Sequence, residues 1–183
     1  MVHMVSSYPA MPGKFDCRCT LQRLYGTASE HSVFYQYNFH NARNIFAGML
    51  QTESPYYQPV PHPPAPFAAA VGAFTSDSVY QCGNSFDGCD ESWAVIMRKC
   101  ENIFITGAGL YSWFSDYAQD CIDKQACQKV LILLDSNYPN VRFQHLVAIG
   151  AKYMALMDGK AISATDNLAV NAHPFGLTYR SST

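Results

Sequence analysis

Two glutamates, Glu30 and Glu53, are the residues in this sequence whose types and spacing best suit chemistry. Glu53 ends an apolar run, and after one serine it is followed by Pro55, Tyr56 and Tyr57. A carboxyl group beside flat aromatic faces is a common setting for sugar binding. Glu30 precedes Glu53 by 53 − 30 = 23 residues, and periods of roughly 20–50 residues are typical of stacked-repeat folds. Neighbouring coils of a parallel β-helix would therefore place both carboxyl groups in one groove, where they could hydrolyse a glycoside.

Paired carboxyl groups hydrolyse glycosides by two routes that differ in spacing. One carboxylic acid protonates the leaving oxygen, and the second group lies roughly 6.5–9.5 Å away for inversion or about 5–5.5 Å away for retention. Strands are roughly 4.8 Å apart and side chains can splay, so the sequence leaves the stereochemistry open. For Glu53 to act as the acid, its pKa must rise above the usual value of about 4.3. Burial beside Tyr56 and a neighbouring Glu30 anion would favour that rise.

Several side chains near predicted strand ends are candidates for substrate contacts, because loops and strand ends carry binding groups. The predicted substrate-binding residues are Tyr37, Gln51, Tyr56, Tyr57, Tyr111 and Trp113. Structural roles remain alternatives at this stage. Glu53 could be a solvated carboxylate at a strand end, Glu30 could cap a turn, and Tyr37 could belong to the core.

The composition excludes several classes of function. Charged residues make up 14% of the 183 residues, and aromatic residues also make up 14%; average domains have about 25% charged residues. The net charge of −2 argues against nucleic acid or an anionic membrane as a partner. Gly107-Ala108-Gly109 lacks the third glycine of a nucleotide fingerprint, and we expect no cofactor.

Seven cysteines are many for a cytosolic protein of this size, which favours an oxidising compartment. The N-terminus nevertheless lacks the regions of a signal peptide. The odd count leaves at least one thiol unpaired, as expected if the chain is a piece of something longer. The close pairs Cys82 with Cys89 and Cys121 with Cys127 are the predicted bridges. Because no CxxC pair is present, we predict no metal site.

The coarse element pattern is that of an all-β chain. Strand-forming runs occur at 33–39, 45–52, 103–106, 130–134, 141–149 and 168–170. Residues 1–22 are expected to be irregular, and residues 67–71 and 92–98 are the predicted helical turns. The segment 59–66 holds five prolines and is expected to be an extended polyproline II loop. A β-sandwich would give similar strands and stays an alternative.

Three strands begin in a similar way. Asn44, Asn102 and Asn140 each stand just before a β-branched residue. Asn tolerates the left-handed backbone of a tight corner, so a coil that turns before each strand would favour it there. The spacings of 58 and 38 residues (102 − 44 and 140 − 102) are uneven, so the three starts do not define a regular repeat.

Four longer motifs resemble one enzyme family. They are Leu24-Tyr25-Gly26-Thr27-Ala28-Ser29-Glu30-His31, Tyr35-Gln36-Tyr37-Asn38-Phe39, Ala47-Gly48-Met49-Leu50-Gln51-Thr52-Glu53-Ser54-Pro55-Tyr56 and Gly107-Ala108-Gly109-Leu110-Tyr111-Ser112-Trp113-Phe114. Together they are similar to the C-terminal part of fungal glycoside hydrolase family 55, the exo-acting β-1,3-glucanases or glucan 1,3-β-glucosidases. The resemblance runs from about residue 24 to about residue 175 and stops abruptly upstream, within residues 8–19.

The resemblance implies a secreted enzyme built of two tandem right-handed parallel β-helices with the substrate groove between them. Such an enzyme releases glucose from the non-reducing end of β-1,3-glucan with inversion. Glu53 matches the general acid, and Glu30 matches the second glutamate, close to the attacking water. The division that follows is an atypical segment at 1–23 and a partial second β-helix at 24–183. The expected partners are β-1,3-glucan and a missing N-terminal β-helix, and the alternative is a truncated remnant that binds β-glucan or has no activity.

Overall fold

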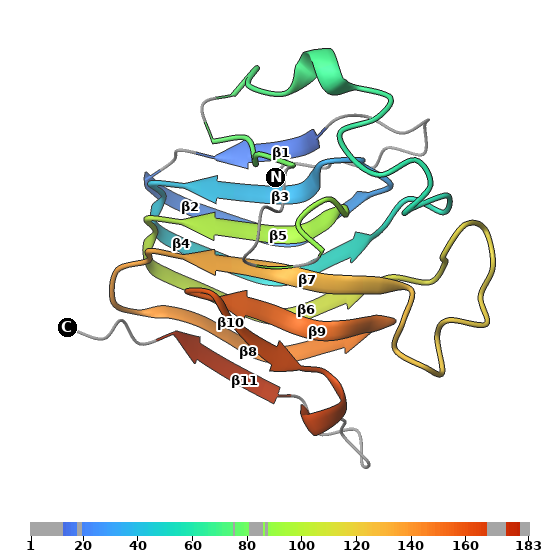
Figure 1. Cartoon of the computed structure of the whole chain (residues 1–183). Helices are drawn as coiled ribbons and strands as arrows, with labels where there is room; N and C mark the ends of the chain where they lie inside the picture. Colours follow the sequence, from blue (N-terminus) through green and yellow to red (C-terminus); the bar gives the residue numbers. More distant parts are fainter. Residues whose placement is uncertain are drawn as a thin grey trace.

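The computed structural model describes residues 13–17, 20–74, 76–80, 86, 88–167 and 175–179. Figure 1 shows that the strands of this region stack one above the next in two sheets. The first sheet has the order β1 (Gly13–Cys17), β3 (Tyr35–His40), β5 (Trp93–Arg98), β7 (Gln128–Asp135), β9 (Ala151–Met157) and β10 (Lys160–Ser163). The second has the order β11 (Phe175–Tyr179), β8 (Val141–Ile149), β6 (Glu101–Tyr111), β4 (Arg43–Glu53) and β2 (Thr20–Glu30).

From β1 to β9, successive strands alternate between the two sheets, so one odd-numbered and one even-numbered strand make a coil. Within each sheet the strands from β1 to β9 pair in parallel, whereas β10 and β11 pair antiparallel to β9 and β8. The fold is therefore all-β with parallel sheets, the arrangement expected of a β-helix. It does not fit the antiparallel sandwich that the sequence left open. The right-handed sense of the coil stays a prediction.

Apolar side chains that point between the two sheets form the main core. Ile45 and Leu50 of β4 join Ile103 and Leu110 of β6 and Phe143 of β8, and each of these side chains is at most 2% exposed. In β4 the buried positions alternate with half-exposed ones such as Phe46, as expected for a sheet with one solvated face. The outward face of this sheet is where polar side chains can serve function.

One corner of the coil carries a ladder of asparagines. The Asn102 side-chain amide donates to Asn44 Oδ1 at 3.2 Å, and that of Asn140 donates to Asn102 Oδ1 at 3.0 Å. All three residues have φ between 53° and 68°, in the left-handed region that Asn tolerates better than most residues. The prediction of Asn-led corners is confirmed. Each side chain supports the next coil where the backbone turns.

The opposite corner holds a buried network of serines and glutamines. The Ser54 and Ser112 hydroxyls lie 2.9 Å apart, and the Gln58 amide donates to Ser112 Oγ at 3.2 Å and to Gln128 Oε1 at 3.0 Å. These side chains are at most 7% exposed. Buried polar groups are costly unless they are hydrogen-bonded, so the network anchors the start of the loops that follow β4 and β6.

Three of the expected local structures are wrong. The predicted helical turn at 92–98 is strand β5, because a second apolar cluster covers the outer face of the first sheet and removes the alternation that identifies a strand. The expected irregular segment 1–22 contains β1 and the start of β2. The proline segment forms turns, with the Ala65 N–H donating to the carbonyl of His62 at 3.1 Å, instead of an extended run. Residues 168–170, a predicted strand, lie outside the described residues.

Two further local predictions, a turn and a disulfide, agree with the structure. The expected turn at 67–71 contains a short 3-10 helix, η1 (Ala68–Ala70), and a second one, η2 (Thr165–Asn167), follows β10. The Cys121–Cys127 disulfide is confirmed, and Cys100 is a buried free thiol. The predicted partner of Cys89, Cys82, lies outside the described residues. In the part of the chain that the structure describes, no helix is long and apolar enough to cross a membrane.

Gly150 makes the single-residue corner between β8 and β9. Its φ is +82°, and an added Cβ would collide with the backbone carbonyl of Ser112 on the neighbouring coil. Gly159 offers a matched control, because its φ is +80° and nothing lies within 4 Å of an added Cβ.

We expect Gly159→Ala to destabilise the fold by about 1–2 kcal/mol, the cost of a left-handed backbone for an L-residue. Gly150→Ala should cost at least about 2 kcal/mol more, because the backbone of the neighbouring coil must also move. Urea unfolding followed by circular dichroism measures both. Equal losses for the two variants would contradict the role given to the Gly150 corner.

Candidate active site

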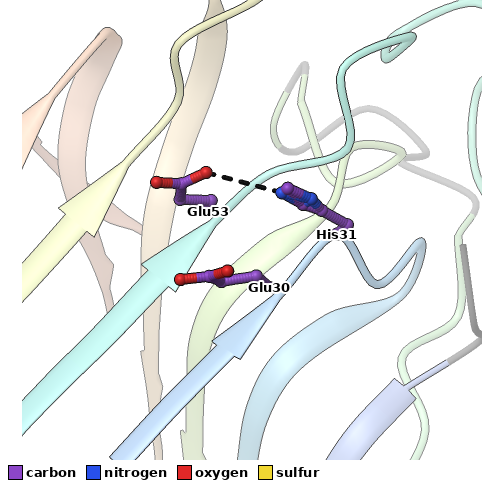
Figure 2. Close-up of side chains that lie close together, drawn as sticks. All are labelled: Glu30, His31 and Glu53. Atoms are coloured by element: carbon purple, nitrogen blue, oxygen red, sulfur yellow. Dashed lines mark hydrogen bonds and ion pairs between the residues drawn. The ribbon is translucent and has the colours of Figure 1, made fainter. Parts of the chain in front are cut away.

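Parallel pairing places Glu30 and Glu53 directly beside each other. Glu30 at the end of β2 is the register partner of Glu53 at the end of β4, which in turn pairs with Tyr111 at the end of β6. The His31 N–H donates to the Glu53 carbonyl at 2.8 Å, which extends the ladder one residue beyond the glutamates. The prediction that the two glutamates occupy neighbouring parallel strands is confirmed (Figure 2).

Strand alternation directs both carboxyl groups outward. Ser29 and Thr52, the residues just before the glutamates, are 3% and 0% exposed, so they point into the coil. Successive side chains of a strand face opposite sides, and Glu30 and Glu53 are accordingly half-buried on the outer face. The two carboxyl groups thus share one surface, at the C-terminal ends of strands β2 and β4 of the five-stranded sheet.

The two carboxylates form a close cluster with His31. One oxygen of each glutamate and one ring nitrogen of His31 lie within 4.8 Å of one another. His31 Nε2 is 3.4 Å from Glu53 Oε2, and the Gln51 side-chain amide donates to Glu30 Oε1 at 2.9 Å. Figure 2 shows Glu30 and Glu53 side by side, with the dashed contact joining Glu53 to His31. Such a group could also share a cation, and the expectation of no metal stays a prediction.

Burial and the Glu30 charge both favour the protonated form of Glu53. The pKa of Glu53 is raised above its ordinary value, first by burial of the carboxyl group and then by the neighbouring Glu30 carboxylate. A hydrogen bond with the Trp113 side chain acts in the opposite direction. A carboxyl group whose protonated form is favoured in this way can donate a proton at a pH where a free glutamate has lost it.

Aromatic rings surround the carboxyl pair. The Tyr56 ring meets His31 edge-on at 4.4 Å between centroids, and it meets Phe114 edge-on at 4.6 Å. The Tyr111 and Trp113 rings are stacked at 5.0 Å with 25° between their planes. Tyr56 remains 42% exposed. These half-exposed rings beside polar groups are surfaces on which sugars can stack.

The structure brings most of the predicted site residues together but not all of them. Gln51, Tyr56, Tyr111 and Trp113 lie at the carboxyl pair. Tyr57 is not among them. It is half-buried, and its ring centroid lies 6.5 Å from that of Tyr117.

Tyr37 is misassigned as a substrate contact. It is 1% exposed and belongs to the core between the sheets. Burial, ahead of other influences, raises its pKa to about 12. Its position on the inner face of β3 leaves it no access to a ligand on the outer face.

Two residues of the site, His31 and Phe114, were not among the predicted ones. His31 immediately follows Glu30 and Phe114 immediately follows Trp113, so adjacency to a predicted site residue was the signal that could have identified them. Their contacts run across coils, however, from His31 to Tyr56 and from Tyr56 to Phe114. A single sequence does not reveal such contacts.

Comparison with known proteins identifies relatives of this chain. No family model matches it. It is 36% identical over 109 residues to a probable glucan endo-1,3-β-glucosidase of Arthroderma benhamiae, covering 60% of this chain and 12% of that protein. It is 30% identical over 154 residues to a glucan 1,3-β-glucosidase of Cochliobolus carbonum, covering 80% of this chain and 18% of that protein.

One relative that matches this chain is named as an effector and not as a glucosidase. Over 85 residues the chain is 48% identical to a non-secreted LysM effector of Penicillium expansum, covering 46% of this chain and 6% of that protein. The chain therefore spans less than a fifth of the length of each of these relatives. Because those named as glucosidases align with between 60% and 80% of this chain, the chain is related to fungal glucan 1,3-β-glucosidases.

Proposed function

We propose that this chain contributes the acid side of a site that hydrolyses β-1,3-glucan. The observation that carries the proposal is Glu53, a half-buried carboxyl group of raised pKa beside a second carboxylate and exposed aromatic rings. Glu53 is the general acid that protonates the leaving glycosidic oxygen. Tyr56, Tyr111 and Trp113 hold the sugar rings by stacking.

Glu30 has the role of keeping Glu53 protonated. An acid and a base that act across a sugar ring with inversion lie roughly 6.5–9.5 Å apart, whereas oxygens of Glu30 and Glu53 come within 4.8 Å of each other. This spacing disfavours Glu30 as the base that activates water. The water-activating group then comes from an N-terminal β-helix, the partner that the sequence resemblance implies.

The finer features of the activity rest on that resemblance. They are exo action from the non-reducing end, release of glucose with inversion, a right-handed coil, and an extracellular location. The substrate groove would form between the outer face at Glu53 and the N-terminal partner, so activity would need both parts.

The experiment that tests the proposal measures laminarin hydrolysis in two arms. The first arm uses this chain as it is, and the second adds an N-terminal β-helix domain from one of the related glucan 1,3-β-glucosidases. Reducing-sugar release in the second arm that depends on Glu53 supports the proposal. Wild-type protein that binds laminarin but hydrolyses nothing in either arm refutes it.

A non-catalytic β-glucan-binding protein is the second candidate. The observation that favours it is the 48% identity to a relative named as a LysM effector, which is not named as a hydrolase. In that case Glu53→Gln would leave laminarin binding unchanged and no hydrolysis would be measured for wild type, while Trp113→Ala would weaken binding.

Glu53→Gln keeps the size of the side chain and removes the proton that can be transferred. In the arm that is active, laminarin hydrolysis should fall by roughly 10²–10⁴-fold, while laminarin binding by calorimetry is retained. Glu101→Gln is the matched control, because Glu101 lies at the opposite end of β6 and pairs with Arg43 at 3.5 Å. Near wild-type turnover for Glu53→Gln would show that the general acid lies elsewhere.

Glu30→Gln tests the role given to the second carboxylate. Removing the Glu30 anion removes one of the causes that raise the pKa of Glu53. The alkaline limb of the pH–rate profile, which reports loss of the acid's proton, should therefore move to lower pH. An aryl glucoside with a good leaving group should partly rescue both Glu30→Gln and Glu53→Gln, since it needs less protonation. If the alkaline limb of Glu30→Gln did not move and the aryl glucoside did not rescue this variant, Glu30 would instead act on the attacking water.

A further inference from the structure

A separate cavity lies against the six-stranded sheet and shares no residue with the Glu30–Glu53 site. It encloses about 660 Å³, and its lining includes Glu91, Lys124, Lys129, Lys152, Tyr153 and Ser163. Binding pockets for small ligands usually have volumes of roughly 300–1,000 Å³. The size is therefore that of a site for a small molecule.

Positive charge is concentrated in this cavity. Three of the chain's six lysines, Lys124, Lys129 and Lys152, line it, although the chain as a whole carries a net charge of −2. Lys124 Nζ is 4.0 Å from the Asp120 carboxylate, and both side chains are more than 70% exposed, so this ion pair is weak. Lys152 Nζ lies 5.2 Å from the centre of the Tyr153 ring. The amino groups of Lys124 and Lys152 are thus suited to a ligand that brings negative charge.

The one carboxyl group of the lining, Glu91, is 7% exposed and accepts a hydrogen bond from the backbone N–H of Lys129. Burial is the main reason that the pKa of Glu91 rises to about 7, with Asp90 adding to the rise and Lys129 and His62 opposing it. Asp90 is itself 3.4 Å from the His62 ring. As the pH falls through about 7, the carboxyl group takes up a proton and the cavity becomes more positive.

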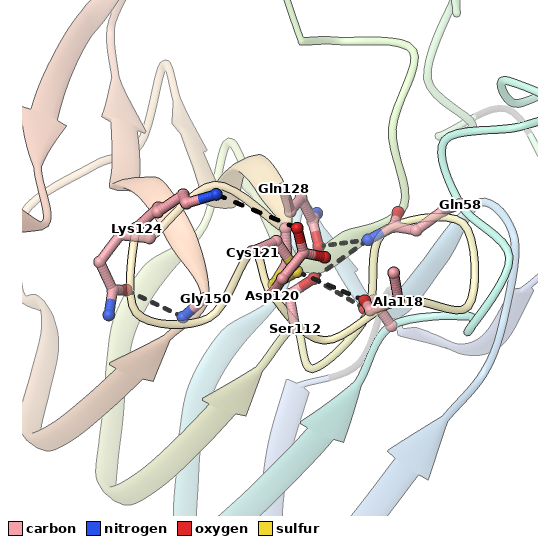
Figure 3. The surroundings of a disulfide bond; sticks show 11 residues. Gln58, Ser112, Ala118, Asp120, Cys121, Lys124, Gln128 and Gly150 are labelled. Atoms are coloured by element: carbon pink, nitrogen blue, oxygen red, sulfur yellow. Dashed lines mark hydrogen bonds and ion pairs between the residues drawn. A yellow bond between two sulfur atoms is a disulfide. The ribbon is translucent and has the colours of Figure 1, made fainter.

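The wall of the cavity around Lys124 is held in place from several sides (Figure 3). The Cys121–Cys127 disulfide closes the loop, and the Cys127 N–H donates to the Gly150 carbonyl at 2.9 Å. The Gly150 N–H donates to Gln125 Oε1 at 2.9 Å. A wall fixed by a covalent link and by backbone hydrogen bonds binds a ligand without first having to be ordered.

We propose that this cavity binds a small ligand that bears an oxyanion, a sugar carboxylate or a sugar phosphate, through Lys124, Lys129 and Lys152. The ammonium groups bind the anion as point charges. Tyr153 and Ser163 offer an aromatic edge and a hydroxyl group to the sugar part. Because an anion favours the neutral form of Glu91, binding is coupled to proton uptake. The affinity consequently falls as the pH rises through about 7, the pKa of Glu91.

Calorimetry with three probes of similar size tests the proposal on the wild-type chain. Glucuronate and glucose 6-phosphate represent the two sources of the oxyanion, and glucose is the neutral control. At about pH 5.5, glucuronate or the phosphate should bind while glucose does not, and the affinity for glucuronate should fall roughly fivefold at about pH 8.5. Equal binding of glucose, or no binding of either anion, would overturn the proposal.

Variants then locate the site. Lys152→Met should weaken anion binding at least roughly fivefold, whereas Lys160→Met, which removes a lysine outside the cavity, should not. Glu91→Gln cannot ionise, so its affinity for glucuronate should be the same at both pH values. A pH dependence that persists in Glu91→Gln, or equal effects of the two lysine variants, would refute the assignment. Circular dichroism shows whether each variant folds. If a variant does not fold, the comparison of the three probes on the wild-type chain still tests whether the cavity binds an anion.

Discussion

The hydrogen bonds that join each coil to the next are the constraint on which the rest of this structure depends. They require the chain to return to the same register after every coil, whatever the length of the intervening loop. The two corners make that return possible. One is supported by the ladder of Asn44, Asn102 and Asn140, and the other by the buried serine and glutamine network around Gln58. The asparagine ladder lies at the surface, whereas the serine and glutamine network is buried and needs its hydrogen bonds to offset the cost of removing polar groups from water.

The candidate active site is a direct consequence of this register. Glu30, Glu53 and Tyr111 are the last residues of three adjacent parallel strands, so each coil adds one side chain to the same row. The loops that follow are anchored by Ser54 and Ser112, which touch each other in the buried corner. Variation in loop length thus changes what surrounds the carboxyl groups without moving them. A rigid scaffold with variable loops is a common arrangement for binding and catalysis.

Electrostatics divides the surface into two regions with different chemistry. At the outer face of the five-stranded sheet, two carboxylates crowd together and the pKa of Glu53 rises. At the six-stranded sheet, three lysines line the same cavity as the buried Glu91, whose pKa is also raised by burial. In both places a carboxyl group keeps its proton beyond the usual pH range because it is partly removed from water. The first arrangement suits proton donation to a leaving group, and the second suits capture of an anion.

Residue types and their spacing in the sequence determined the strand-rich character of the chain, the Asn corners, the Cys121–Cys127 bridge and the pairing of Glu30 with Glu53. Each depends on residue type or on spacing along the chain, which a single sequence contains. The tertiary structure decided the rest. Strand β5 was hidden because the segment between β4 and β5 buries its outer face and erases the alternating pattern. Tyr37 points into the core, and His31 and Phe114 reach the site through contacts between coils. Only the stacking of coils specifies which faces are covered and which distant side chains meet.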